Sequence, residues 1–81
     1  MTQSHGESTD AELVGRARVG ESAAFELLVR RYLEAALNAA RRLLDNPADA
    51  EDAVQDAFIT ALERLDNCRD PARFGGWLLT I

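Results

Sequence analysis

The sequence predicts an all-α fold, a compact bundle of three main helices followed by the start of a fourth. Two observations support this. Apolar residues recur at intervals of three and four over most of the 81 residues, which is the period of an amphipathic helix. Between these segments stand Gly20, Asn46-Pro47 and Asp70-Pro71, residue types that end or begin helices. The sequence shows no strand-like alternation and no repeat of fixed period.

The first residues are polar, and residues 1–9 are expected to form a disordered tail. Asp10 is expected to cap a short first helix that ends near Val19, because Gly20 follows there. The helical domain is therefore expected to cover residues 10–81.

A long second helix is predicted from Glu21 or Ser22 to Leu44, packed antiparallel against the third helix. Asp45-Asn46-Pro47 ends it, because the residue before a proline resists the helical conformation. Its apolar positions repeat at three and four: Phe25, Leu28, Val29, Tyr32, Leu33, Ala36, Leu37, Ala40, Leu43 and Leu44.

The third helix is predicted to begin at a cap formed by Asp49 and to end near Leu65. At about 100° per residue, its apolar residues form one face: Ala50, Ala53, Val54, Ala57, Phe58, Ala61, Leu62 and Leu65. The opposite stripe holds Asp52, Gln55, Asp56, Ile59 and Glu63.

This opposite stripe carries acids and an amide around Ile59, without a Lys or Arg along it. Such a surface is more typical of protein docking than of mere solubility. The alternative is a solvated helix back whose acids favour the helix N-terminus, and single exposed apolar residues are common.

The fourth helix is predicted to start with Asp70 as its cap and Pro71 at its first position. Phe74, Trp77, Leu78 and Ile81 share one face of it. This spacing favours a core position for Trp77 over a role in stacking on a nucleic-acid base. The apolar pattern is still running at Ile81, so the chain is expected to be a fragment of a longer protein.

Two glycines, Gly75 and Gly76, fall inside the fourth helix, where each costs about 1 kcal/mol relative to alanine. They indicate a close approach to a neighbouring helix or to DNA, and the sequence leaves both open.

The net charge of −5 is unevenly distributed, because residues 45–66 hold seven acids against one arginine. This balance argues against general binding of phosphate backbones and favours a basic protein partner for the acidic segment. The pairs Arg30-Arg31 and Arg41-Arg42 are expected to pair with local acids rather than to grip phosphate.

Several classes of protein are disfavoured. No apolar run approaches the roughly 20 residues that cross a bilayer, and the polar N-terminus does not resemble a signal peptide, so a cytoplasmic protein without a membrane partner is expected. Enzymatic activity is not expected, since there is no phosphate loop and His5 has no orienting partner. No metal or cofactor is expected. Cys68, the single cysteine, is expected to be a small loop residue, with a redox-responsive thiol as the alternative.

Three segments resemble bacterial RNA polymerase sigma factors, in the order and spacing of region 2 of the extracytoplasmic-function (ECF) group. They are FELLVRRY at 25–32, AEDAVQDAF at 50–58 and FGGWLLTI at 74–81. The second segment is the specific one, while the first is similar to many amphipathic helices. The resemblance covers about residues 10–81 and implies a domain of a transcription initiation factor.

The resemblance implies that the third helix docks on the clamp helices of the polymerase β′ subunit. Carried over by position, the polar contacts are Asp52, Gln55 and Asp56, and the apolar ones are Ile59 and Leu62. It also implies that an anti-sigma factor masks this surface.

In the full-length protein, the resemblance further implies recognition and melting of the promoter minus-ten element on the non-template strand. The connection before the fourth helix then helps to hold a flipped-out base, which implicates Asn67, Cys68, Arg69, Asp70 and Arg73. Binding of DNA by this chain alone is expected to be weak. Two other classes remain open: a helical protein–protein interaction module unrelated to transcription, and a small enzyme.

Overall fold

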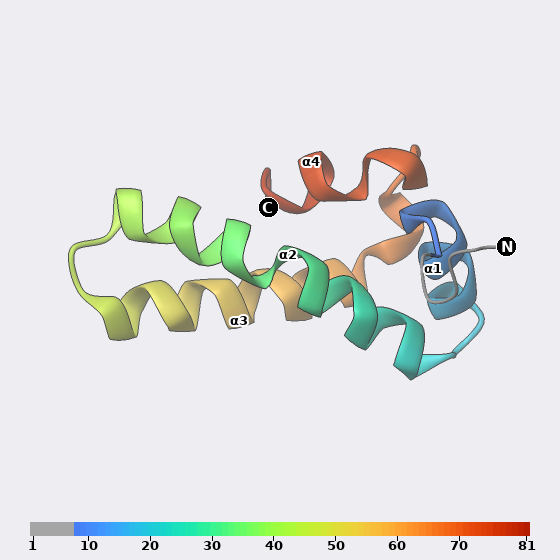
Figure 1. The fold of residues 1–81 in the computed structure, drawn as a ribbon, viewed down its shortest axis with the longest axis horizontal. Coiled ribbons are helices and arrows are strands. Elements are labelled where there is room, and N and C mark those ends of the chain that lie inside the picture. The colour runs from blue at the N-terminus through green and yellow to red at the C-terminus, as the bar shows by residue number, and fades with distance from the viewer. Residues whose placement is uncertain (1–7) are drawn as a thin grey trace, which may run out of the picture.

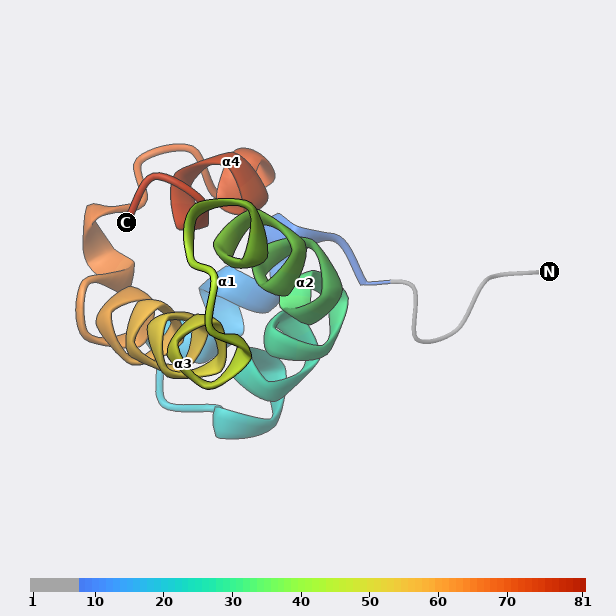
Figure 2. The ribbon, with the colours of Figure 1, turned by 90° about the vertical axis from the view of Figure 1, so that its left-hand side faces the viewer.

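The computed structural model describes residues 8–81, and these residues are all-α, as predicted. The long helices α2 and α3 lie side by side and antiparallel, α1 packs at the open end of this hairpin, and α4 lies over one side of it (Figures 1 and 2). The helices are α1 (Asp10–Arg18), α2 (Ser22–Leu43), α3 (Pro47–Glu63) and α4 (Phe74–Leu78), with 3₁₀ turns at Leu65–Asn67 and Pro71–Arg73.

The cap of α1 differs from the prediction. Thr9 is the N-cap, and its hydroxyl accepts from the backbone N–H of Glu12 at 3.1 Å while the Glu12 carboxylate accepts from the Thr9 N–H at 2.8 Å. Asp10 is the first helical residue, so its assignment as the cap was wrong. The Thr-x-x-Glu spacing is the sequence signature of this reciprocal cap. The rest of the expected tail, residues 1–7, lies outside the described residues.

The turn between α1 and α2 depends on Gly20, whose φ of +97° is rarely accessible to other residues. Arg16 and Glu21 pair across this turn. This hydrogen-bonded pair raises the pKa of Arg16 and lowers that of Glu21.

The start of α3 also differs from the prediction. Asn46 is the N-cap, with its side-chain oxygen accepting from the Ala48 N–H at 2.8 Å, and Pro47 occupies the first turn. Asp49 was therefore wrongly assigned as the cap. The same Asn46-Pro47 pair ends α2 and begins α3, because proline lacks the donor that a helix interior needs but fits the first helical position.

The start of the fourth helix is interrupted. Pro71–Arg73 forms a 3₁₀ turn, and the α-helical part is only the five residues of α4. Asp70 makes no side-chain capping bond, contrary to the prediction. Its carboxylate lies instead 3.6 Å from Nε of Arg73.

The core is formed by apolar side chains from all four helices and the connection after α3: Leu13, Val14, Ala24, Phe25, Leu28, Ala36, Val54, Phe58, Ala61, Leu65, Cys68, Phe74 and Leu78. The predicted inner face of α3 is confirmed at its centre, but Ala53 is exposed and Leu62 is 50% exposed. These two residues lie at the edges of the apolar stripe, where the neighbouring helices no longer cover them.

The predicted apolar pattern of α2 is only partly buried. Leu43 is 84% exposed, and Leu33 and Leu44 are also exposed. Leu43 and Leu44 lie near the tip of the hairpin, away from α1 (Figure 1). Ile81 is likewise 45% exposed, so it does not share the burial of Phe74 and Leu78. Within residues 8–81, no helix combines the length and the apolar character that spanning a membrane requires.

Candidate functional site

The outward face of α3 has the geometry expected of a docking surface. Asp52, Gln55 and Asp56 are exposed, while Phe58 on the opposite side is only 7% exposed. Ile59 is 56% exposed among these polar side chains. The helix thus presents two distinct faces, one packed in the core and one exposed to solvent.

The acids on this face are not paired within the domain. Among the described residues, no ion pair includes Asp52 or Asp56. A carboxylate without an internal partner can pair with an incoming cation without first breaking another contact. The residues predicted to take part in docking are called the docking face from here on: Asp52, Gln55, Asp56, Ile59 and Leu62.

Leu62 extends the apolar part of the docking face toward α1 and α2. It borders a cavity of about 380 Å³ that is also lined by Ala17, Gly20 and Phe25. Leu62 and Ile59 therefore offer adjacent exposed apolar surface, flanked by an open hollow into which a partner side chain can reach.

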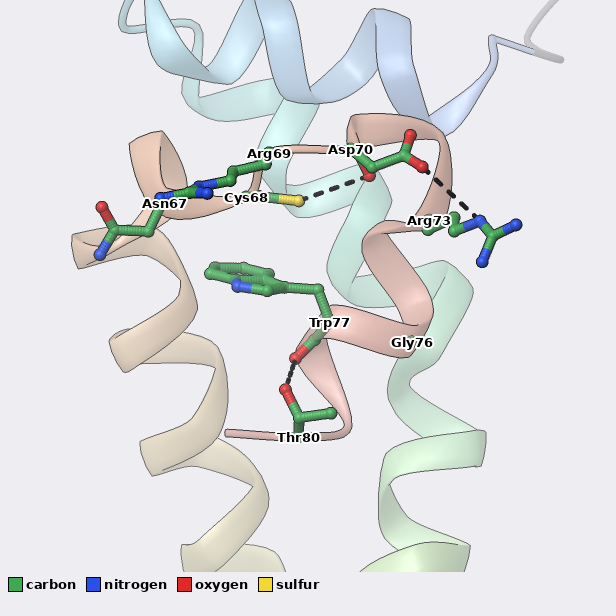
Figure 3. Close-up of a pocket in the computed structure, with 8 residues that line it drawn as sticks. All are labelled: Asn67, Cys68, Arg69, Asp70, Arg73, Gly76, Trp77 and Thr80. Carbon is green, nitrogen blue, oxygen red and sulfur yellow. Dashed lines mark hydrogen bonds and ion pairs between the residues drawn. The ribbon is translucent and has the colours of Figure 1, made fainter.

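A second candidate site is a pocket of about 480 Å³ between the connection after α3 and α4 (Figure 3). Its lining contains all five residues that the resemblance implicated in holding a base, together with three more: Asn67, Cys68, Arg69, Asp70, Arg73, Gly76, Trp77 and Thr80. We call this the loop pocket. Gly76, Trp77 and Thr80 were not among the predicted site residues.

Trp77 takes only in part the core position that its spacing favoured, because one side of it also lines the loop pocket. It is half-buried, packs against the core, and its ring lies 5.8 Å from that of Phe74 at an interplanar angle of 48°. Figure 3 shows its indole extending toward Asn67 and Arg69 across the loop pocket. An aromatic surface inside a pocket is suited to stacking on a planar ligand.

Cys68 contributes to the structure of the loop pocket more than to its chemistry. Its side chain is 1% exposed, and its Sγ lies 3.7 Å from the backbone oxygen of Asp70, to which the thiol donates. Burial raises the pKa of the thiol. A buried thiol of raised pKa is a poor nucleophile, because the thiolate is the reactive form.

The charged residues of the loop pocket are exposed. Arg69, Arg73 and Asp70 are accessible to solvent, and Arg73 pairs with Asp70 in a mixed-charge rim. The rim therefore supplies guanidinium donors for an anionic or polar ligand. Elsewhere in the domain, Arg31 pairs with Asp10 of α1 at 2.9 Å. Among the described residues no ion pair includes Arg30, Arg41 or Arg42, so the expected pairing of these arginines with acids is found at Arg31 alone, and with a partner on another helix.

The close approach indicated by the glycine pair occurs at Gly75 and involves α2. A Cβ at Gly75 would lie 2.5 Å from Cε1 of Tyr32, whereas a Cβ at Gly76 would meet nothing within 4 Å. The Tyr32 ring also packs on Phe74, with ring centroids 5.7 Å apart. Gly75 therefore allows α4 to approach α2, while Gly76 faces the loop pocket.

The described residues hold no group of three or more His, Cys, Asp or Glu side chains that is placed to bind a metal ion. The candidate chemistry of residues 8–81 is that of binding surfaces, an exposed acidic and apolar face on α3 and an aromatic loop pocket.

Comparison with known proteins identifies similar chains. The family model described as Sigma-70 region 2 matches residues 28–81. The RNA polymerase sigma-H factor of Pseudomonas aeruginosa is 38% identical over 72 residues, which is 89% of this chain and 37% of that protein. The ECF RNA polymerase sigma-E factor of Escherichia coli K12 is 40% identical over 73 residues, 90% of this chain and 38% of that protein. The chain thus spans less than two fifths of the length of these relatives. No solved structure matches.

Proposed function

The chain belongs to the sigma-70 region 2 family, and on this basis we propose that it is a domain of an ECF-type transcription initiation factor. In this role it docks on core RNA polymerase, and as part of the full-length protein it recognises and melts the promoter minus-ten element. The names of its relatives, RNA polymerase sigma factors, support this assignment.

The observation that carries the proposal is the docking face of α3. The proposed partner is the pair of clamp helices of the β′ subunit, with Asp52, Gln55 and Asp56 as polar contacts. Ile59 and Leu62, both at least half exposed, supply the apolar part of the contact. A mixture of apolar anchors and unpaired charges suits a specific but reversible interface.

The loop pocket is the proposed site for an unpaired base of the non-template strand. Stacking of a base on an aromatic side chain contributes about 1–3 kcal/mol, which offsets part of the few kcal/mol that extruding a base costs. The net charge of −5 disfavours independent binding of DNA by this chain. We therefore place base capture after docking on the polymerase.

An anti-sigma factor is the second proposed protein partner. It would cover the docking face and so compete with the polymerase for the same residues. The proposed role also places the protein in the cytoplasm, where the polymerase acts.

Docking is tested by pull-down of core polymerase with the full-length protein. The double variant Gln55→Ala, Asp56→Ala is expected to weaken binding by about tenfold or more, since central interface residues often contribute more than 1 kcal/mol each. The control is Glu34→Ala, Asn38→Ala, which removes an acid and an amide from the exposed side of α2.

The control variant is expected to bind like the parent. Binding of the Gln55→Ala, Asp56→Ala variant at parental strength would refute the docking proposal. A helical interaction module unrelated to transcription would then become the better assignment.

A further inference from the structure

Arg18, the last residue of α1, reaches across to the segment that forms one wall of the loop pocket. Its Nη2 donates to the backbone oxygens of Leu65 at 3.1 Å and of Cys68 at 2.6 Å. Its Nε lies 3.7 Å from the carboxylate of Asp66. One guanidinium group thus contacts three of the four residues between 65 and 68.

These contacts hold both ends of the segment 65–68, which is the 3₁₀ turn Leu65–Asn67 followed by Cys68. Leu65 and Cys68 are buried, whereas Asn67 between them is exposed at the loop pocket. Within the described part of the chain, no side chain from another element except that of Arg18 hydrogen-bonds to residues 65–68. The conformation of this wall therefore depends on Arg18 more than on any other long-range polar contact.

Arg18 does not itself line the loop pocket. The opposite wall is held by different contacts, the packing of Phe74 on Tyr32 and on Trp77. Loss of Arg18 should thus loosen one wall and leave the aromatic wall in place.

We propose that Arg18 is a positioning residue that preforms the loop pocket for an unpaired base of the promoter strand. This inference rests on the proposed function of that pocket. A segment that is already ordered need not lose conformational freedom when the base binds, so the affinity is higher. Hydrogen bonds from a charged donor to partly buried carbonyl groups are strong enough to supply such order.

The test uses holoenzyme assembled from the full-length protein and core polymerase. The probes are fluorescent single-stranded oligonucleotides of the non-template strand, each with one abasic site at a different position of the minus-ten element. With the parent, the abasic site at the captured position is expected to weaken binding by roughly 10- to 100-fold relative to the intact strand. We call the ratio of the two affinities, that of the intact strand divided by that of the abasic strand, the base penalty.

Arg18→Met removes the donors and keeps a long side chain. It is expected to weaken binding of the intact strand by about tenfold and to leave binding of the strand with the critical abasic site nearly unchanged, so that the base penalty shrinks. Arg18→Lys retains a charged donor with a shorter reach and is expected to give an intermediate penalty. The control Arg16→Met lies on the same helix, where Arg16 pairs with Glu21, and it is expected to match the parent.

The outcomes separate this inference from the proposed function. A parent holoenzyme with no base penalty at any position would refute the base pocket itself. A base penalty in Arg18→Met equal to that of the parent would overturn the role of Arg18 alone. This includes the case in which the variant binds the intact and the abasic strand more weakly by the same factor, as a merely structural defect would cause. If the Arg18→Met protein does not form holoenzyme, the test is made with Arg18→Lys. A base penalty in Arg18→Lys equal to that of the parent then overturns the inference.

Discussion

Gly75 shows how one missing methyl group sets the position of a helix. A Cβ at this position would lie within 3 Å of two ring atoms of Tyr32, and the Tyr32 hydroxyl is hydrogen-bonded to Asp10. Because the ring is held at its far end, Gly75→Ala is expected to lower the free energy of unfolding by about 1–3 kcal/mol. Urea unfolding measures this change.

The neighbouring glycine is the control for this prediction. Gly76→Ala meets open space and should stabilise the helix by up to about 1 kcal/mol. Equal effects of the two substitutions would show that α4 does not approach α2 through Gly75.

The hydroxyl of Tyr32 makes stability depend on pH at alkaline values. Burial, followed by the hydrogen bond to Asp10, raises its pKa from 10.0 to about 12. The neutral phenol is thus favoured by folding. Its contribution is complete below pH 10 and is lost as the pH rises from about 10 to about 12.

The measurement is the free energy of unfolding across this range in the parent and in Tyr32→Phe. In Tyr32→Phe, the free energy of unfolding should fall less between pH 10 and pH 12 than in the parent, because the contribution of the Tyr32 hydroxyl is missing. Tyr32 is the only tyrosine of the chain, so phenolate absorbance reports its titration directly. A titration midpoint near pH 10 for Tyr32 in the folded chain would contradict the raised pKa.

At the scale of elements, helix boundaries depend on a few side-chain hydrogen bonds. Asn46 caps α3 by accepting from the Ala48 N–H, whereas Asp49 lies inside the first turn. Asn46→Ala is therefore expected to lower the free energy of unfolding by about 1 kcal/mol. Asp49→Ala should have a smaller effect, limited to the interaction with the helix dipole. Thermal unfolding shows which of the two variants is less stable. A larger loss of stability in Asp49→Ala than in Asn46→Ala would restore Asp49 as the cap.

The caps also show where prediction from the sequence ends. The 3.6-residue period identified α2 and α3 to within a few residues, because burial of an apolar face extends over many turns. Each cap, in contrast, depends on which of several neighbouring polar residues reaches a free N–H group. Asn46 and Asp49 are similar candidates by residue type, and small differences in backbone path decide between them, whereas the Thr-x-x-Glu spacing does distinguish Thr9 from Asp10.

At the scale of the whole molecule, the charged side chains of the described residues lie outside the core. The chain carries a net −5, and the docking face contributes two acids, Asp52 and Asp56, that make no ion pair among the described residues. If a basic surface of the polymerase attracts these acids, then the association rate should fall as salt rises from about 0.1 M to about 0.5 M. Asp52→Asn, Asp56→Asn should reduce both the rate at low salt and its salt dependence.

Stopped-flow association of the full-length protein with core polymerase measures this effect. Glu34→Gln neutralises one exposed acid of α2 outside the docking face and should retain the parental salt dependence. Identical salt dependence in all three proteins would remove the acids of α3 from the docking step.

The amino-acid sequence alone determined the fold class, the antiparallel hairpin of α2 and α3, and the outward position of Gln55 and Asp56. Each of these follows from a helical period that is repeated over many residues. Tertiary structure decided the loop pocket, which Trp77 lines together with Asn67 and Arg69, and the contact of Arg18 with a segment almost fifty positions further along the chain. Local sequence patterns do not predict these contacts. The contacts depend on how separate helices pack and on where the connection after α3 places its carbonyl groups.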